Sequence, residues 1–247
     1  MTKDNKNAAP LILAIDSTAT VATVAVTRGR QLMSVSTSDT GHTHSETLLP
    51  MIESMLRNLH ISIEDIGLFA CATGPGSFTG VRIGVSIIKG LAFGRDIPCV
   101  SVSPLEALAE NLSGLEGIFC PAMDARRNQV YNALFRCQNG KTERFVPDRA
   151  IAIADLATEL AAFSEMPIYL SGDAYNLLTD NLPNYGIKPE LTPELLRRQS
   201  AYSVALCGYD AFLSGKTVTA AALSPVYLRL PQAERERLKK QNNRSPS

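Results

Sequence analysis

Two short stretches of this chain combine residue types that could bind an anion. Asp16, Ser17 and Thr18 follow an apolar run and therefore end a predicted strand. Gly74 and Gly76 form a predicted turn between a second apolar run and a long helix. Ligands of α/β proteins bind beyond the carboxyl ends of strands, and the N–H groups at a helix start attract anions. The sequence therefore indicates phosphate or nucleotide binding at these five residues.

The glycine turn departs from the two common phosphate-binding motifs. A P-loop ends in Gly-Lys-Ser/Thr, whereas Gly80 is followed by Val81 and Arg82. The dinucleotide fingerprint needs Gly-x-Gly-x-x-Gly, and the third glycine here comes one residue late. A tight turn with close helix packing is therefore an open alternative, as are local hydrogen bonds made by Asp16 and Ser17.

Asp124 and Arg126 form a second charged group, at the end of another predicted strand. A carboxylate beside an arginine could grip a phosphate or a carboxylate, which makes both residues candidate polar groups of a cleft. A surface salt bridge that contributes little to stability is the alternative. The residue types alone favour neither interpretation.

The sequence contains no specific set of residues for nucleophilic or metal catalysis. No Ser-His-Asp set, Cys-His pair or carboxylate dyad can be assembled from the spacing. His42 and His44 lie one residue apart, but a zinc site needs three or four ligands and no third is apparent nearby. We therefore predict no catalytic residue, no metal and no cofactor.

The composition indicates one large domain or two small ones with a substantial core. The chain has 247 residues, 45% of them hydrophobic, and 24 basic residues balance 24 acidic ones. This balance argues against capture of nucleic acid through the chain's own field, though not against work on RNA beside a basic partner. Five dispersed cysteines read as reduced core residues of a cytoplasmic protein. No apolar run approaches the ~20 residues that cross a bilayer, so no membrane contact is expected.

The helix predicted at residues 77–93 is apolar on two sides. One face carries Phe78, Val81, Val85, Ile88 and Ala92, and a second row carries Ile83, Ile87 and Leu91. Since a helix with two apolar faces is buried on both, one face can cover a sheet while the other needs a second helix. Gly80 and Gly84 lie one turn apart and would let that second helix come close.

A second helix, at residues 43–59, also carries more apolar surface than one sheet contact needs. Thr43 and Glu46 form a predicted capping box at its start, and Pro50 predicts a kink or a later start. Its wide leucine and methionine stripe suits an adaptable contact surface. Ordinary core packing is the alternative.

The order of the predicted elements repeats once along the chain. The first half has strands at 11–15, 21–26, 31–36, 66–72 and 98–102, with the helices 43–59 and 77–93; the second half has strands at 118–124, 130–136, 141–146 and 168–170, with helices at 153–163, 175–180 and 193–214. Two successive β-β-β-α-β-α units predict the α/β class and a duplicated actin-like (ribonuclease H-like) ATPase fold with a cleft between its halves. We expect a disordered N-terminus at 1–10, subdomains at 11–104 and 105–231, and a charged, disordered tail at 232–247.

Five motifs resemble one bacterial family over nearly the whole chain, from about residue 11 to residue 229. They are residues 13–18 (LAIDST), 44–52 (HSETLLPMI), 74–84 (GPGSFTGVRIG), 123–131 (MDARRNQVY) and 225–229 (PVYLR). On these motifs the chain is identified as a member of the TsaB (YeaZ) family, and the motif at 74–84 is long and highly specific.

The resemblance implies a subunit needed to make N6-threonylcarbamoyladenosine, a modification beside the anticodon of tRNAs that read codons beginning with A. TsaD is the catalytic subunit, and TsaB looks like an inactive relative of it within the glycoprotease-like group. TsaD-like chains carry a His-x-x-x-His metal pair where this chain has residues 101–108 (SVSPLEAL), which contain no histidine. Glu106 alone cannot replace that pair, because imidazoles at that spacing build the site.

In the family, the two helices with excess apolar surface form the subunit contact. The resemblance thus implies an interface with TsaD, or with a second copy of this chain, made by His44, Leu48, Met51, Ile52, Met55, Phe78, Gly80, Val81, Arg82, Gly84, Val85 and Ile88. The TsaE ATPase would join the complex, and tRNA would be reached indirectly. We therefore predict a non-catalytic scaffold. A metallopeptidase-like or actin-like ATPase enzyme in its own right is the alternative hypothesis.

Overall fold

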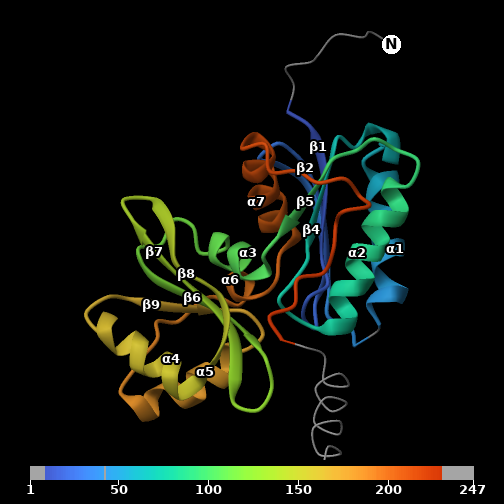
Figure 1. Cartoon of the computed structure of the whole chain (residues 1–247). Helices are drawn as coiled ribbons and strands as arrows, with labels where there is room; N and C mark the ends of the chain where they lie inside the picture. Colours follow the sequence, from blue (N-terminus) through green and yellow to red (C-terminus); the bar gives the residue numbers. More distant parts are fainter. Residues whose placement is uncertain (1–8, 42, 230–247) are drawn as a thin grey trace, which may run out of the picture.

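The computed structural model describes residues 9–41 and 43–229, which form two lobes (Figure 1). A five-stranded sheet lies at the centre of the first lobe and a four-stranded sheet at the centre of the second. The predicted disorder at 1–10 and 232–247 falls outside the described residues except at Ala9 and Pro10, and Pro10 accepts a hydrogen bond from Gly29 N at 3.0 Å. Within the described part of the chain, no helix is long and apolar enough to cross a membrane.

The sheet of the first lobe has the strand order β3-β2-β1-β4-β5. Its strands are β1 (Leu11–Asp16), β2 (Ala22–Arg28), β3 (Gln31–Ser38), β4 (Leu68–Ala72) and β5 (Cys99–Val102). β1 pairs antiparallel with β2 and parallel with β4. Every residue of β1 and β4 is buried, which accounts for their continuous apolar runs, because both faces of these central strands are covered.

Helices cover both faces of this first sheet (Figure 1). On one face lie α1 (His44–Asn58) and α2 (Phe78–Ala92), packed on side chains such as Leu13 and Ile15. On the other face lies α7 (Ala201–Leu213), packed on Ile12 and Ala14. The predicted capping box at the start of α1 is present, and α1 runs through Pro50 from His44 onward rather than starting late.

The second lobe has the strand order β8-β7-β6-β9. Its elements are β6 (Gly117–Asp124), β7 (Gln129–Gln138), β8 (Lys141–Ala152), β9 (Ile168–Ser171), α4 (Ile153–Leu160) and α5 (Tyr175–Asn181). α4 and α5 cover one face of the sheet. The other face packs on α3 (Pro104–Glu110), where Leu105 and Leu108 meet Phe119 and Phe135. Short 3-10 helices occur at Ile63–Asp65, Ala161–Phe163 and Leu182–Tyr185.

The predicted duplication is confirmed. The order β1-β2-β3-α1-β4-α2 in the first lobe corresponds to β6-β7-β8-α4-β9-α5 in the second. The sheets correspond as well, since β3-β2-β1-β4 matches β8-β7-β6-β9. A cleft between the lobes follows from this arrangement, with the carboxyl ends of β1 and β6 facing it.

The long helix predicted at residues 193–214 is wrong in its middle. Two helices stand there, α6 (Glu194–Arg197) and α7 (Ala201–Leu213), separated by an extended segment. Asn111 holds this break, because its Nδ2 donates to Leu196 O at 3.1 Å and to Arg198 O at 2.7 Å. Beyond the break, α7 returns to the first sheet, although the expected boundaries assigned residues 105–231 to the second half.

Residues 220–229, here called the C-terminal strap, cross the first lobe towards the cleft. Val226 N donates to Thr73 O at 2.8 Å, which places the strap beside the end of β4. The Tyr227 ring lies 5.1 Å from the Phe78 ring between centroids. Arg229 Nη1 reaches across the cleft to Ala125 O at 3.1 Å. The strap therefore joins the first lobe to the end of β6.

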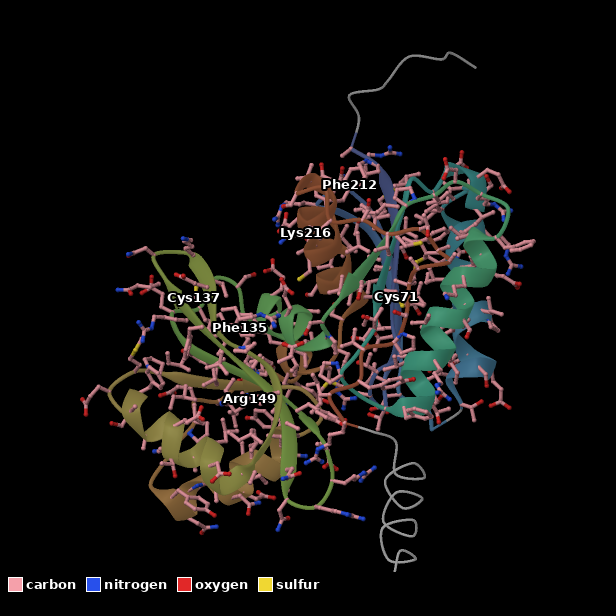
Figure 2. All side chains as sticks on the ribbon, viewed as in Figure 1. Cys71, Phe135, Cys137, Arg149, Phe212 and Lys216 are labelled. Atoms are coloured by element: carbon pink, nitrogen blue, oxygen red, sulfur yellow. The ribbon has the colours of Figure 1, made fainter. Side chains whose placement is uncertain are left out.

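The five cysteines are free thiols, as the sequence indicated, and four of them are buried. Figure 2 shows Cys71 at the first sheet and Cys137 in the second lobe. Burial raises the pKa of the Cys71 thiol well above its usual range and raises that of Cys120 to about 12. Both thiols are therefore protonated, unreactive core groups near neutral pH.

Candidate functional site

The glycine turn predicted to bind phosphate is packed against this chain's own backbone. Gly74 has a φ of +112°, and a Cβ there would lie 2.4 Å from Val226 O. A Cβ at Gly76 would lie 2.4 Å from Thr18 O. Ser77 N, at the start of α2, donates to the same Thr18 carbonyl at 2.7 Å. Close approach of two carbonyl groups therefore explains both glycines without a bound anion.

Asp16 and Ser17 make hydrogen bonds inside the protein, while the buried Asp16 Oδ2 has no partner among the described residues. Asp16 Oδ1 accepts hydrogen bonds from Thr18 N and Thr18 Oγ1, both at 2.7 Å. Burial raises the pKa of the Asp16 carboxyl above its ordinary value, against those two hydrogen bonds. Ser17 Oγ donates to Gly80 O at 2.8 Å. The Asp16–Thr18 contacts are the local turn interactions that the sequence left open as an alternative to ligand binding, whereas the Ser17 contact reaches α2.

A cavity of about 570 Å³ lies in the cleft between the lobes. Thr18 and Gly76 line it from the first lobe, and Asp124 and Arg126 line it from the second. The structure thus brings together four of the predicted site residues. It leaves Asp16, Ser17 and Gly74 outside the lining of this cavity.

The charged pair in the cleft is a mostly exposed ion pair. Arg126 Nη1 lies 3.2 Å from Asp124 Oδ2, and the Arg126 side chain is 87% exposed. Such pairs contribute less than about 1 kcal/mol. Asp173 follows β9 and lies beside this pair, because its Oδ1 accepts a hydrogen bond from Asp124 N at 3.0 Å. Burial, together with the neighbouring Asp124, raises the pKa of Asp173 to about 6.

Gly80 and Gly84 face the end of β1, and Gly80 also faces α1 of the same chain, because a Cβ there would lie 3.2 Å from His44 Cδ2. A Cβ on Gly80 would lie 2.0 Å from Ser17 O, and one on Gly84 would lie 2.7 Å from Ser17 Oγ. The predicted close approach is real, but it is made to the end of β1 in the same chain. Neither glycine therefore offers surface to a partner.

The predicted interface residues divide into an inner and an outer set. The inner set is buried in this chain's own core; it consists of Leu48, Ile52, Met55, Val81, Val85 and Ile88. Met51 is half-buried against the same core. His44 is half-buried and places Nε2 2.8 Å from Ala19 O. Only Phe78 and Arg82 of the predicted residues line the open outer side of the helix pair.

An apolar groove of about 460 Å³ runs between α1 and α2 on that outer side. Its apolar lining comes from Leu49, Phe78, Ile83 and Ile87. Leu49 is 41% exposed, which is unusual for a leucine in the middle of a helix. Leu49, Ile83 and Ile87 are not among the predicted interface residues. The second apolar row of α2 contains Ile83 and Ile87, and Leu49 belongs to the leucine and methionine stripe of α1. We call this surface the outer groove.

The strap shapes one end of the outer groove. The Arg82 guanidinium lies 3.8 Å above the centroid of the Phe78 ring. Arg82 Nε also donates to Tyr227 OH at 2.8 Å. This stack holds Phe78 between an arginine and a tyrosine, so the aromatic end of the groove is preorganised.

The stretch that lacks the histidine pair has structural contacts of its own. Ser103 Oγ accepts from Glu106 N at 3.3 Å as the cap of α3. Glu106 Oε2 forms an ion pair with Arg144 Nη2 at 3.1 Å. Among residues 9–41 and 43–229, no three His, Cys, Asp or Glu side chains are grouped to hold a metal ion. His42 lies outside these residues.

The chain resembles proteins of one tRNA-modification pathway. Residues 34–236 match the family described as TsaD, tRNA N6-adenosine threonylcarbamoyltransferase. The tRNA threonylcarbamoyladenosine biosynthesis protein TsaB of Bacillus subtilis is 32% identical over 90% of this chain and 96% of its own length. The TsaB protein of Escherichia coli is 41% identical over 39% of this chain and 43% of its own length.

A solved structure agrees with the fold. It is described as an uncharacterized protein with similarity to peptidase YEAZ from Pseudomonas aeruginosa. It is 26% identical, covers 89% of this chain and all of its own, and superposes with a TM-score of 0.74. The likeness extends over both lobes.

Proposed function

Because this chain belongs to the TsaB (YeaZ) family, we propose that it is a non-catalytic scaffold subunit for N6-threonylcarbamoyladenosine formation in tRNA. A role in the biosynthesis of this modified nucleoside follows from the family. The finer proposal is that this chain docks and organises the catalytic subunit TsaD in the cytoplasm. The TsaE ATPase joins the complex, and tRNA is reached through it.

The outer groove carries this proposal. Its apolar lining lies on the outside of two helices whose inner sides already fill the core, so a second protein can cover it without unfolding this chain. Apolar and aromatic side chains with an arginine at the edge are typical of the buried centre of a protein interface. The occupant we propose is a helical face of TsaD, and a second copy of this chain is the competing occupant.

The contacts of residues 101–108 support a non-catalytic role. Ser103 caps α3 and Glu106 pairs with Arg144 of β8, so the polar groups of this stretch have partners within this chain. Asp16, Ser17 and the glycine turn likewise make internal contacts. Most polar groups at these positions therefore contact this chain, and Asp16 Oδ2 is a buried oxygen without a partner among the described residues.

The interface is tested by placing a charge in the outer groove. We expect Ile83→Glu and Ile87→Glu to abolish co-elution with TsaD in size-exclusion chromatography, because a buried unpaired carboxylate costs several kcal/mol. Leu213→Glu is the matched control, since Leu213 is 64% exposed at the end of α7 on the opposite side of the sheet. Gly84 is unsuitable for this test because it packs on Ser17.

Unchanged complex formation by both groove variants would exclude the outer groove as the TsaD contact. Loss of a self-dimer with an intact TsaD complex would assign the groove to a second copy. In cells depleted of this protein, nucleoside analysis of tRNA should show loss of threonylcarbamoyladenosine. The wild-type chain and Leu213→Glu should restore the nucleoside, whereas the groove variants should not.

The alternative of an enzyme in its own right has a separate test. The purified chain is assayed alone for bound zinc or iron and for ATP hydrolysis. The scaffold proposal expects neither stoichiometric metal nor turnover above background. Either result would replace the scaffold with a catalytic function for this chain.

A further inference from the structure

A second, smaller cavity of about 370 Å³ lies between the lobes on the other side of Asp173. Thr20 and Val21, just beyond β1, line it from the first lobe. Gly172 and Tyr175, just beyond β9, line it from the second. Ligands of α/β sheets bind at the carboxyl ends of strands, and volumes from ~300 Å³ upward are typical of small-molecule sites.

A buried amide in the wall of this cavity lacks a partner. Gln199 is only 4% exposed, and its Nε2 has no hydrogen-bond acceptor among the described residues. An unsatisfied buried donor costs about 1–3 kcal/mol, so native structures rarely retain one. Rotation about the last side-chain torsion turns the amide hydrogens towards either side. An acceptor supplied by a ligand would satisfy them.

A second donor in the same wall is the guanidinium of Arg197. Arg197 stacks 4.3 Å above the centroid of the Tyr175 ring, and its side chain forms no ion pair within the described part of the chain. Its neighbour Arg198 differs, because it pairs with both Asp39 and Glu194. Stacking on Tyr175 fixes the plane of the Arg197 guanidinium, which prepares its fork of N–H donors for a planar anion.

The cavity wall carries two arginines, Arg197 and Arg198, and three carboxyl groups, Asp39, Asp173 and Glu194. Asp39 and Glu194 share the single positive charge of Arg198 as their ion-pair partner. Asp173 uses Oδ1 to accept a hydrogen bond from Asp124 N, and burial raises the pKa of its carboxyl to about 6. The Arg197 guanidinium and the Gln199 Nε2 group are donors of this wall that make no hydrogen bond or ion pair with the described residues.

From these contacts we infer that the cavity binds a small molecule through a carboxylate or phosphate group held by Arg197 and Gln199. The two chemistries share the requirement for two or more acceptor oxygens beside a guanidinium. The site shares no lining residue with the outer groove, so the inference stands independently of the proposed contact with TsaD.

The test titrates the isotope-labelled full chain with inorganic phosphate or with acetate at constant ionic strength, and follows amide NMR shifts. We expect saturable shifts at Gln199 and Gly172, with a Kd on the order of millimolar. The anion that saturates at lower concentration identifies the group that the site prefers. Gln199→Met removes the donor at nearly constant size, and Arg197→Gln removes the charge. Each should weaken binding at least tenfold.

Lys188→Gln is the matched control, because it removes one exposed positive charge in the same lobe and should leave binding unchanged. Arg197→Lys keeps the charge without the fork and should give an intermediate affinity, which covers the case in which Arg197→Gln fails to fold. Absence of saturable shifts with both anions would overturn the inference. So would wild-type affinity in Gln199→Met and Arg197→Lys.

Discussion

At the scale of single residues, Gly80 and Gly90 share one helix but meet different surroundings. A Cβ at Gly80 would lie 2.0 Å from Ser17 O, whereas one at Gly90 would meet nothing within 4 Å. We expect Gly80→Ala to lower the free energy of unfolding by about 1–3 kcal/mol, because the backbone of β1 must move. Gly90→Ala should raise it by about 0.5–1 kcal/mol through helix propensity.

Urea denaturation of both variants measures this difference. Gly90→Ala is a control for the general effect of alanine in α2. Equal stabilities for the two variants would show that α2 is not held against Ser17 as described. The unchanged far-ultraviolet circular dichroism of both variants would exclude loss of the helix as the cause.

Asp173 predicts a dependence of stability on pH. Its pKa is raised from 3.8 to about 6 in the folded chain. Between these values the folded chain keeps a proton that the unfolded chain has released, so stability falls as pH rises through this window and levels off above it. Asp173→Asn should flatten this fall, because asparagine still accepts from Asp124 N through its oxygen and does not titrate.

The measurement is a set of urea midpoints for both proteins from about pH 4 to about pH 7. The difference between the two curves isolates Asp173 from Asp16, whose pKa is also raised and acts in the same direction. A constant difference across the range would contradict the assignment. A difference that grows with falling pH in favour of the wild type would support it.

The residue types predicted only some of the residues that line the cavity between the lobes. The ends of β1 and β6 could be located, so Thr18, Gly76, Asp124 and Arg126 do line one cavity. Helical spacing shows which residues share a face but not what covers that face, so Gly80 and Gly84 were assigned to a partner. No sequence motif points to Arg197 and Gln199, because their positions depend on the extended segment between α6 and α7.

At the scale of elements, Asn111 determines how α6 and α7 are joined. Its Nδ2 binds two carbonyl groups of the break, and its Oδ1 accepts from Ser203 Oγ at 2.5 Å. We expect Asn111→Ala to lower the free energy of unfolding by about 1–3 kcal/mol, since partly buried carbonyl groups lose their donor. Urea denaturation measures this, with the exposed Asn58→Ala as control.

A double-mutant cycle separates this network from simple side-chain loss. Asn111→Ala and Ser203→Ala remove two ends of one hydrogen bond, so their effects should sum to more than the effect of the double variant. Additive effects would mean that the break is held by other contacts. The sequence predicted one unbroken helix at 193–214, because a tertiary hydrogen bond from residue 111 leaves no local signal in that stretch.

At the scale of the whole molecule, α3 joins the two lobes through an apolar cluster. Leu105 and Leu108 of α3 pack on Phe119 and Phe135 of the second sheet, and α3 also packs on α7 of the first lobe. We therefore expect one cooperative thermal transition, with equal calorimetric and van't Hoff enthalpies. Leu108→Ala should lower the free energy of unfolding by about 2–5 kcal/mol and keep a single transition.

Leu178→Ala, in the core of the second lobe, is the companion variant. If the lobes unfold together, it moves the same single transition. Two separate calorimetric transitions, of which only one moves, would show that α3 does not couple the lobes.

The architecture was more predictable than the boundaries. Apolar runs and turn residues are local, so the repeated β-β-β-α-β-α order could be predicted from the sequence. The return of α7 was not predictable, because Ala201, Val204 and Ala205 suit either sheet. Only the uncovered side of β1 and β4, opposite α1 and α2, determines where this helix lies.

The return of α7 has a consequence for synthesis on the ribosome. β1 to β5 emerge first, yet one side of their sheet stays bare until residues 201–213 have been translated. The nascent first lobe must therefore wait through synthesis of the entire second lobe with Ile12, Ala14 and Ala70 uncovered. A ribosome stalled after residue 190 should present a chain that binds chaperones, and release of α7 should end that binding.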